Sequence, residues 1–398
     1  MSSPEFYKKK LKNGLTVLFE SRKQPVVSVC SAVQYGSGHE PTLTKGAAHL
    51  IEHMTFKGTK TRTHDQIARE IEKKGGVINA TTGEEVTFYW NKLPSKHLKA
   101  GIDISSDLIL NPLLDAKEFE KEKKVVLEEI KMYRDNPRYH VMEKIKEMLY
   151  KEPFSIFGAG TPDTVSKLTR EDIFKIYNTN YSTNNMILCV VGKADFEEIC
   201  KLAEKNFPGR IGKTAPIKPV LTNKNEVEIR KGIDQANFMF GVHCPKRGPD
   251  SYAFRVLLMY LAGGMSSVLH EEIREKRGLV YTIRGDLDIG ASYGYATIYA
   301  GTMKKNISKI KGLILEELKK IKNLNRKELE ETKEQLIGLS GIASEDSTNV
   351  MEMLIQEEIA GGAERYYDYE KLISQVKLDD VRKAAKIKSY STFALVPQ

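Results

Sequence analysis

The chain has 398 residues, of which 40% are hydrophobic and 29% are charged, an ordinary balance for a globular protein. This length is sufficient for two compact domains with sizeable cores. No stretch approaches the roughly 20 apolar residues that a membrane-spanning helix requires, and the first residues contain no apolar signal region. We therefore expect a cytoplasmic protein without a membrane partner.

The formal net charge of +9 alone would be compatible with a nucleic-acid partner. However, Lys and Arg are spread along the chain and interleaved with Glu and Asp, and the sequence shows no aromatic–basic RNA-binding motif. We expect no nucleic-acid partner. The four cysteines are far apart in the sequence and are expected to be small buried hydrophobes in a reducing compartment: Cys30, Cys189, Cys200 and Cys244.

The first half of the sequence alternates between strand-like and helix-like patterns. The predicted elements, in chain order, are a hairpin at 7–20, a strand at 26–35, helices at 46–56 and 64–74, a strand at 84–93, helices at 97–110 and 117–133, a helix opened by a capping box at Thr169, and a buried strand at 185–194. The stretch PGRIGKTAPIKP at 208–219 lacks apolar periodicity. We interpret it as part of a linker at 209–224, between domains at 1–208 and 225–398.

The second half of the sequence repeats the pattern of the first. VTFYWNKLPSKHLKAGIDISSDLILNPLLDAKEFEKEK, from Val86, and ATIYAGTMKKNISKIKGLILEELKKIKNLNRKELEETK, from Ala296, both read as a strand, an amphipathic helix and a charged helix. The ends NYSTNNMILCVVG and KSYSTFALVP also correspond. The pattern predicts an α+β fold made by tandem duplication of two similar units, each a mainly antiparallel sheet packed with helices. The alternative is two unrelated α+β domains of similar order.

The stretch GAAHLIEHMTFKGT at 46–59 places polar residues in an otherwise apolar helix. His49 and His53 are four residues apart, so they lie on one helical face and could bind one metal ion, whereas a structural role would make them satisfied core histidines. Glu52 borders the same face. The corresponding stretch of the second half, FRVLLMYLAGG, has no His or acid. The fold therefore does not require these polar groups, which favours the metal site.

A catalytic zinc ion usually takes three protein ligands. The helix FEKEKKVVLEEIKMY at 119–133 carries two acids, Glu122 and Glu129, on its predicted inner face, whereas Glu128 falls on the outer face. Glu122 and Glu129 are about 10.5 Å apart along the helix axis, too far to reach one ion easily. We expect one of them to be a ligand and the other to orient a ligating histidine.

HLIEH, followed by EKEKKVVLEEIKMYRDNP, resembles the inverted zinc metallopeptidases, the family of pitrilysin, insulysin and the mitochondrial processing peptidase. Small members of that family have this length and doubled layout. Its third ligand follows the second His by some 75 residues, and Glu129 follows His53 by 76. The resemblance implies one Zn²⁺ per chain, held by His49, His53 and Glu129. It also implies Glu52 as general base and Glu122, seven positions before Glu129, as partner of a ligand.

The resemblance also implies substrate-binding residues. Asn79 and Ala80 match a pair that binds the substrate backbone by adding it to a sheet edge. Arg274 and Tyr281 match an Arg and a Tyr that bind the substrate in the second half, and Tyr281 would donate to the developing oxyanion. Without the family, REKRGLVY reads only as a helix end followed by a strand, and Arg277 would be an equal candidate.

The stretch before the metal helix, GSGHEPTLTKG, departs from the family pattern. We expect His39 there to be a surface loop residue and not a ligand. The remaining histidines are expected to be structural or exposed: His64, His97, His140, His243 and His270.

Together these residues predict a zinc-dependent endopeptidase that acts on peptides or unfolded polypeptide segments. Larger family members close two doubled units around a chamber, so the resemblance implies a homodimer of this chain, with a heterodimer with a related subunit as the alternative. Arg274 and Tyr281 would then serve the partner's zinc. The alternative function is a non-catalytic scaffold or partner subunit of the same fold.

Overall fold

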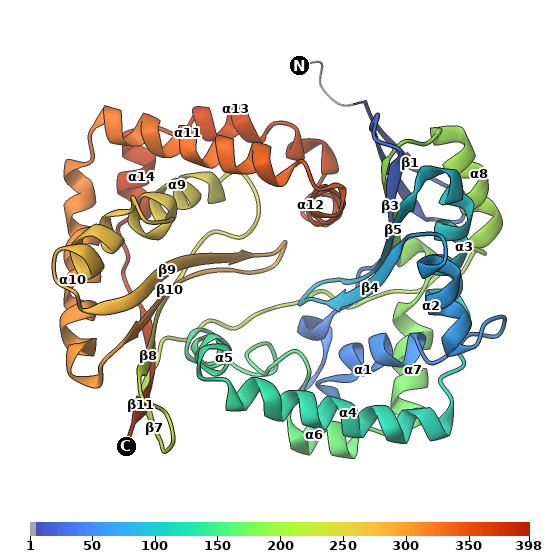
Figure 1. Cartoon of the computed structure of the whole chain (residues 1–398), viewed down its shortest axis with the longest axis horizontal. Helices are drawn as coiled ribbons and strands as arrows, with labels where there is room; N and C mark the ends of the chain where they lie inside the picture. Colours follow the sequence, from blue (N-terminus) through green and yellow to red (C-terminus); the bar gives the residue numbers. More distant parts are fainter. Residues whose placement is uncertain (1–4) are drawn as a thin grey trace. The chain divides into compact units, whose positions relative to one another are not determined.

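The computed structural model describes residues 5–398, which form two compact units (Figure 1). The first unit contains the chain up to Ile130 together with two later segments, Ile156–Ile217 and Ala343–Tyr366. The second unit consists of three segments: Lys131–Ser155, Lys218–Ile342 and Tyr367–Gln398. Each unit is built on one sheet with its own hydrophobic core.

The sheet of the first unit has six strands in the order β1-β2-β6-β3-β5-β4. Their bounds are β1 Phe6–Lys10, β2 Thr16–Ser21, β3 Val26–Val33, β4 Val77–Thr82, β5 Thr87–Pro94 and β6 Met186–Gly192. Only β2 and β6 run parallel, and the other neighbours are antiparallel. The strand β4 lies at one edge, so its outer backbone groups are not paired within the sheet.

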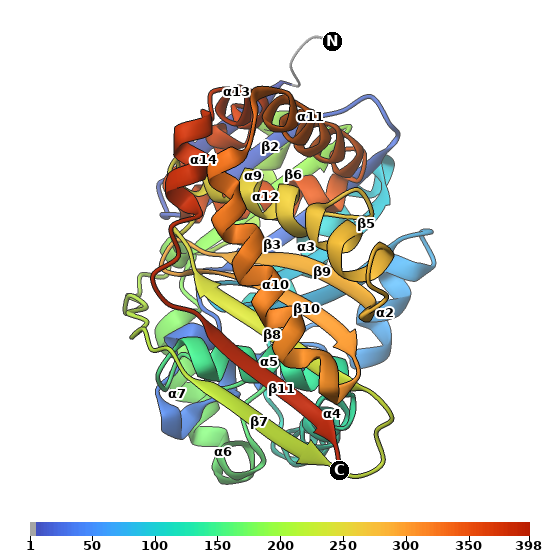
Figure 2. The same cartoon turned by 90° about the vertical axis from the view of Figure 1, so that its left-hand side faces the viewer.

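The sheet of the second unit repeats this order with five strands, β7-β11-β8-β10-β9. Their bounds are β7 Asn225–Arg230, β8 Ala236–His243, β9 Val280–Ile289, β10 Gly294–Thr302 and β11 Ser391–Pro397. Its single parallel pair, β7 and β11, occupies the same place as β2 and β6 (Figure 2). The predicted α+β duplication of mainly antiparallel sheets is therefore confirmed, and β4 corresponds to β9.

Helices cover both faces of the first sheet. They are α1 Ala47–Thr55, α2 His64–Glu72, α3 Leu98–Leu110, α4 Ala116–Asp135, α6 Pro162–Lys167, α7 Arg170–Asn180, α8 Phe196–Asn206 and α12 Ser347–Ile359. On one face, α3 packs on β3 and β5, while α1 and α2 pack on β4. On the other face, α12 packs on β3 and β6, and Figure 1 shows it opposite α3 and α8.

The second unit has a similar arrangement around its own sheet. Its helices are α5 Pro137–Leu149, α9 Ser251–Ala262, α10 Ile307–Lys320, α11 Arg326–Ala343, α13 Tyr369–Ser374 and α14 Leu378–Ala384. The helix α9, the counterpart of α1, packs on β9. The helix α5 packs on β8 and β11, where His140 Nε2 lies 2.7 Å from Glu228 Oε2 of β7.

The two sequence halves therefore exchange equivalent helices. The helix α5, from the first half, belongs to the second unit, and α12, from the second half, belongs to the first unit. Contacts to the first sheet tie α12 in place: Ser347 Oγ lies 2.8 Å from Ser28 Oγ, and Asp346 lies 3.0 Å from Lys92 Nζ. The compact units thus differ from the continuous segments 1–208 and 225–398, because each sheet needs a helix from the other half to cover its second face.

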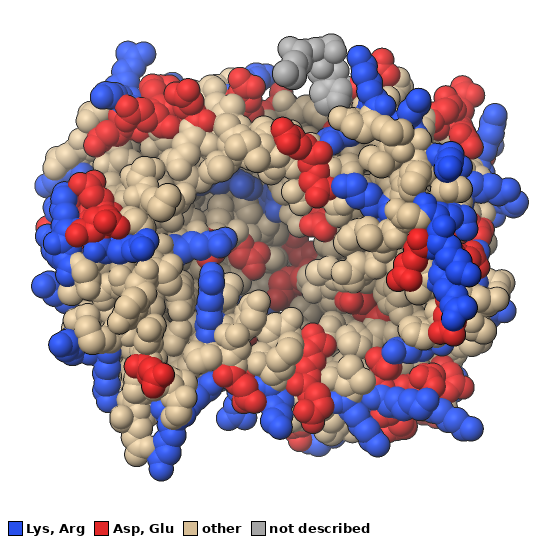
Figure 3. Space-filling view, viewed as in Figure 1, with Lys and Arg blue, Asp and Glu red and all other residues tan. Residues whose placement is uncertain are grey.

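The described surface carries mixed charge. In Figure 3, Lys and Arg are interspersed with Asp and Glu over the part of each unit that is in view. Among residues 5–398, the structure contains no helix long and apolar enough to cross a membrane. All four cysteines are free, and Cys30, Cys189 and Cys200 are buried.

Candidate metal centre

The helix α1 starts from an unusual backbone position that fixes its direction. Its N-cap, Gly46, has φ of +98°, and a Cβ there would lie 2.5 Å from the Ala159 carbonyl oxygen, so only glycine fits. The buried carboxylate of Glu40 accepts hydrogen bonds from the backbone N–H groups of Gly46 (2.9 Å) and Ala48 (2.5 Å). Glu40 therefore satisfies two N–H groups at the start of the helix that would otherwise lack partners.

Burial holds the rest of α1 in place. The side chains of Leu50, Ile51 and Met54 are fully buried in the core of the first unit. The remaining helical face carries His49 and His53, and their rings lie 4.6 Å apart, centre to centre. The apolar contacts thus fix the rotation of the helix and present both imidazoles to α4.

The ligating atoms of His49, His53 and Glu129 come within 4.8 Å of one another. Glu129 Oε2 lies 3.7 Å from His49 Nε2 and 3.5 Å from His53 Nε2. Ligands about 2.0–2.2 Å from a tetrahedral zinc ion are separated by roughly 3.3–3.6 Å. The two separations between Glu129 and the histidines are close to this range. Two imidazoles and one carboxylate are a ligand set that suits Zn²⁺ and would leave a fourth position for water. Glu128, the neighbouring acid, is exposed.

Glu122 orients one of these histidines. Its side chain is only 7% exposed, and its Oε2 lies 3.1 Å from His53 Nδ1. Lys57, just beyond the end of α1, contacts the other carboxylate oxygen at 2.8 Å. A carboxylate at Nδ1 favours the tautomer that carries its proton there, leaving Nε2 free to bind a metal ion.

The two histidines differ in their electrostatic surroundings. Burial, reinforced by the neighbouring His53, lowers the pKa of His49 to about 4, so its imidazole is neutral near pH 7. Burial also acts to lower the pKa of His53, but hydrogen bonds to Glu129 and Glu122 outweigh it and raise that pKa. The hydrogen bond with His53 lowers the pKa of Glu129, so this carboxylate is ionised as a metal ligand must be.

Glu52 lies between the two histidines in sequence but turns to a different partner. Its Oε2 accepts a hydrogen bond from Thr82 Oγ1, at the end of the edge strand β4. Burial raises the pKa of Glu52, and this hydrogen bond opposes the increase. A half-buried carboxylate with a raised pKa, close to two imidazoles, is suited to accept and return a proton.

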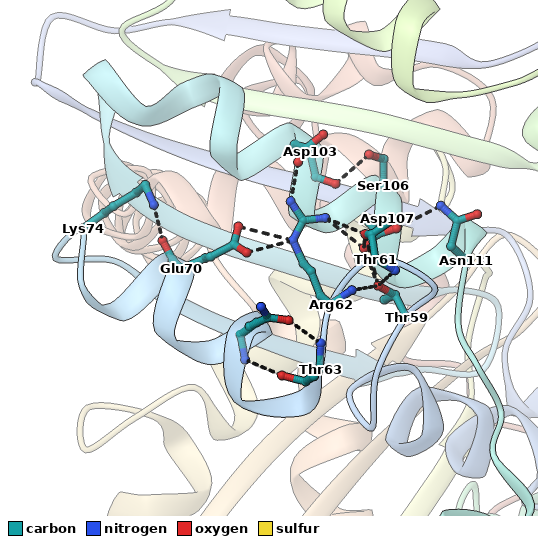
Figure 4. Close-up of polar contacts among 11 residues, drawn as sticks. Thr59, Thr61, Arg62, Thr63, Glu70, Lys74, Asp103, Ser106, Asp107 and Asn111 are labelled. Carbon is teal, nitrogen blue, oxygen red and sulfur yellow. Dashed lines mark hydrogen bonds and ion pairs between the residues drawn. The ribbon is translucent and has the colours of Figure 1, made fainter.

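The segment that follows α1 is held by an ion-pair network (Figure 4). Arg62 contacts three carboxylates, those of Glu70 on α2 and of Asp103 and Asp107 on α3. Thr61 Oγ1 also donates to Asp107 at 2.7 Å. These bonds connect the loop after α1 to both neighbouring helices, which limits movement of the end of the metal helix that bears His53.

The residues expected to bind substrate lie on both units. Asn79 is exposed on β4, and Ala80 is buried beside α1, so both belong to the edge strand next to Glu52. Arg274 lies in the helical turn His270–Glu275 of the second unit, where its Nη1 is 2.9 Å from His270 Nε2. Tyr281 lies on β9 with 62% of its surface exposed.

The expectation for His39 is wrong in one respect. The residue is half-buried in the turn Ser37–His39, where its Nδ1 accepts a hydrogen bond from the Gly36 N–H at 3.1 Å and its ring stacks on Tyr35. It therefore has a structural role in the loop before α1.

Three residues of this centre were not predicted from the sequence: Glu40, Lys57 and Thr82. For Thr82 a signal was available, because alternation along β4 places it on the same face as the buried Ala80. Glu40 and Lys57 act through contacts whose geometry no local pattern encodes.

Comparisons with known proteins show which family the chain is similar to. The family model described as "Insulinase (Peptidase family M16)" matches residues 16–156, which include all the metal-site residues. The model described as "Peptidase M16 inactive domain" matches residues 167–336. An uncharacterised zinc protease of Rickettsia felis is 31% identical over 398 residues, covering 97% of this chain and 96% of the relative. One from Bacillus subtilis is 29% identical, covering 89% and 88%.

Solved structures show the same fold. A protease from Helicobacter pylori superposes with a TM-score of 0.92 at 24% identity, covering 99% of this chain and 100% of that chain. A Pseudomonas fluorescens protein described as a peptidase M16 inactive domain gives a TM-score of 0.88 at 18% identity, covering 99% and 98%. Both are similar to this chain over its whole length.

Proposed function

Because the chain belongs to the insulinase (M16) family of peptidases, we propose that it is a zinc-dependent endopeptidase that cleaves peptides or unfolded polypeptide segments. The observation that carries the proposal is the convergence of His49, His53 and Glu129, with Glu52 held beside them. A duplicated fold alone needs none of these groups, since the equivalent helix α9, Ser251–Ala262, contains no His, Asp or Glu.

The roles of the chain's own residues follow from their positions. His49, His53 and Glu129 would hold the ion, and Glu122 would keep Nε2 of His53 directed toward it. Zinc, when bound, polarises the scissile carbonyl and lowers the pKa of a water molecule. Glu52 would accept a proton from the attacking water and return it to the leaving amine.

Substrate binding is proposed to use the free edge of β4. An extended peptide would add to the sheet there, and Asn79 and Ala80 would contact its main chain. Arg274 and Tyr281 would bind the same peptide, and the phenol of Tyr281 would donate to the oxyanion. We propose that they act on the zinc site of a second copy, in a homodimer that encloses the substrate. A heterodimer with a related subunit is the alternative assembly.

The decisive experiment uses a quenched fluorescent peptide of about ten or more residues. We expect the purified chain to cleave it, a chelator to abolish cleavage and added zinc to restore it. Glu52→Gln should retain zinc and lose at least about 100-fold in kcat, since a positioned general base contributes 10²–10⁴-fold. Glu128→Gln, an exposed acid on α4, is the matched control and should keep full activity.

The same experiment tests the alternative function, a non-catalytic scaffold or partner subunit. The description of one structural neighbour as an inactive domain favours this alternative. A scaffold would bind peptide without cleaving it and would be indifferent to Glu52→Gln. Cleavage that resists the chelator, or full activity of Glu52→Gln, would exclude the proposed mechanism.

A further inference from the structure

The carboxylate of Glu52 needs a partner that fixes its direction. It follows His49 by three residues and directly precedes His53, and carboxylates are themselves common zinc ligands. In the structure Glu52 is not part of the group of three ligating residues. It turns instead toward β4 and accepts the hydrogen bond of Thr82 Oγ1.

The position of Thr82 on β4 connects this hydrogen bond with the free edge of the sheet. Side chains along a strand alternate between its faces, so Ile78, Ala80 and Thr82 all face α1 and α2. The backbone of the same strand forms the free edge of the sheet, beyond which no described strand lies. One strand therefore presents an edge to an incoming peptide and a hydroxyl to the base.

We infer that Thr82 is the positioning residue for Glu52 and that it couples the substrate-binding edge to proton transfer; this rests on the proposed function. Thr82 holds the carboxylate in the direction needed for proton transfer and away from the metal ligands. Because it belongs to the strand that pairs with the peptide, the scissile bond and the base are placed by one rigid element. Such alignment is where much of an enzyme's rate advantage arises.

The first test is kinetic and uses the zinc-loaded full-length chain. Thr82→Val replaces the hydroxyl with a methyl group and keeps the β-branched shape that a strand favours. We expect kcat to fall about 10-fold, part of what a positioned general base supplies, with KM and bound zinc within about 2-fold of wild type. Loss of zinc in parallel with activity would instead mean that the substitution damages the metal site, and the inference would be wrong.

Two control variants separate positioning from general support of the strand. Thr82→Ser retains the donor and should restore kcat to within about 3-fold of wild type, because the hydrogen bond and not the methyl group carries the effect. Thr81→Val makes the same chemical change on the exposed face of β4, away from Glu52, and should show no coupling to Glu52 in the unfolding equilibrium. A serine variant as slow as the valine variant would contradict the inference.

The second test does not depend on activity. The unfolding equilibria of zinc-free wild type, Thr82→Val, Glu52→Leu (which removes the acceptor) and the double variant form a double-mutant cycle. If Thr82 and Glu52 interact, the unfolding constant of the double variant should fall about 10-fold short of the value expected from independent effects. Independent effects would overturn the contact itself. A wild-type chain without chelator-sensitive cleavage would instead refute the proposed function, and with it the catalytic purpose of Thr82.

Discussion

At the scale of single residues, the centre depends on carboxylates that differ by only a few positions along α4. Glu129 faces the two imidazoles, Glu122 faces the back of His53, and Glu128 points to solvent. Helical geometry explains the division, since residues seven apart lie on one face and a residue one step away lies about 100° round the axis. Small changes of position should therefore have very different effects on zinc binding.

Glu129→Gln and Glu128→Gln test this division directly. Glutamine removes the anionic ligand, so we expect Glu129→Gln to bind zinc at least about 100-fold more weakly, beyond the 10–100-fold range typical of residues behind a ligand. Glu128→Gln should bind zinc like wild type. Competition with a chromophoric chelator measures both affinities, and equal affinities would contradict the assignment of Glu129.

Glu122→Gln should weaken zinc binding by roughly 10-fold, because a neutral amide orients the His53 imidazole less firmly and adds less to its basicity. It also leaves Lys57 without its counter-charge. Glu120→Gln, on the exposed side of α4, is the control. The same chelator competition provides the measurement, and wild-type affinity in Glu122→Gln would show that the His53 contact does not influence the metal.

The sequence could reveal the residues that come from regular patterns, and no others. His49, His53 and the two inner acids follow from helical spacing, and the choice of Glu129 required the family resemblance. Glu40 could not be found, because it folds back from an irregular loop to the start of α1. Such contacts depend on the path of the loop, which local periodicity does not describe.

At the scale of elements, the exchange of α5 and α12 means that the hydrophobic core of each unit needs a helix from the other half of the sequence. Leu354 and Ile355 of α12 are fully buried, and α12 covers the face of the first sheet opposite α3. The sequence predicts that amphipathic helices bury one face, but it does not state against which sheet. For this reason the order of elements and the duplication were predictable, whereas the composition of the two units was not.

Leu354→Ala should destabilise the first unit by about 2–5 kcal/mol, the usual cost of removing a buried leucine side chain. The only tryptophan of the chain, Trp90, lies on β5, so its fluorescence reports the unfolding of that unit in denaturant. Leu339→Ala, at an exposed position of α11, is the matched control and should change stability by less than about 0.5 kcal/mol. An unchanged Trp90 transition in Leu354→Ala would show that α12 contributes little to the first unit.

At the scale of the whole molecule, the proposed assembly assigns the metal site and the substrate-binding pair Arg274 and Tyr281 to different copies. Two inactive chains should then complement each other. Mixing Glu52→Gln with Arg274→Ala/Tyr281→Phe should restore about one quarter of wild-type activity, the statistical share of complete sites in a randomly exchanged homodimer. Peptide cleavage, followed after subunit exchange, gives the measurement. If exchange is demonstrated and the mixture stays inactive, the two residues do not act on the partner's zinc.

The exchange of helices also determines when the first unit can complete its packing during synthesis on the ribosome. All strands of the first sheet have been synthesised by Gly192, but α12 ends only at Ile359. For the intervening length of chain, the nascent first unit has an apolar sheet face without its helix, including Cys30 and Cys189, which are buried in the finished protein. The candidate metal centre therefore sits in a unit that reaches its final packing only near the end of translation, so we expect the proposed zinc site to take its final form late in the synthesis of each chain.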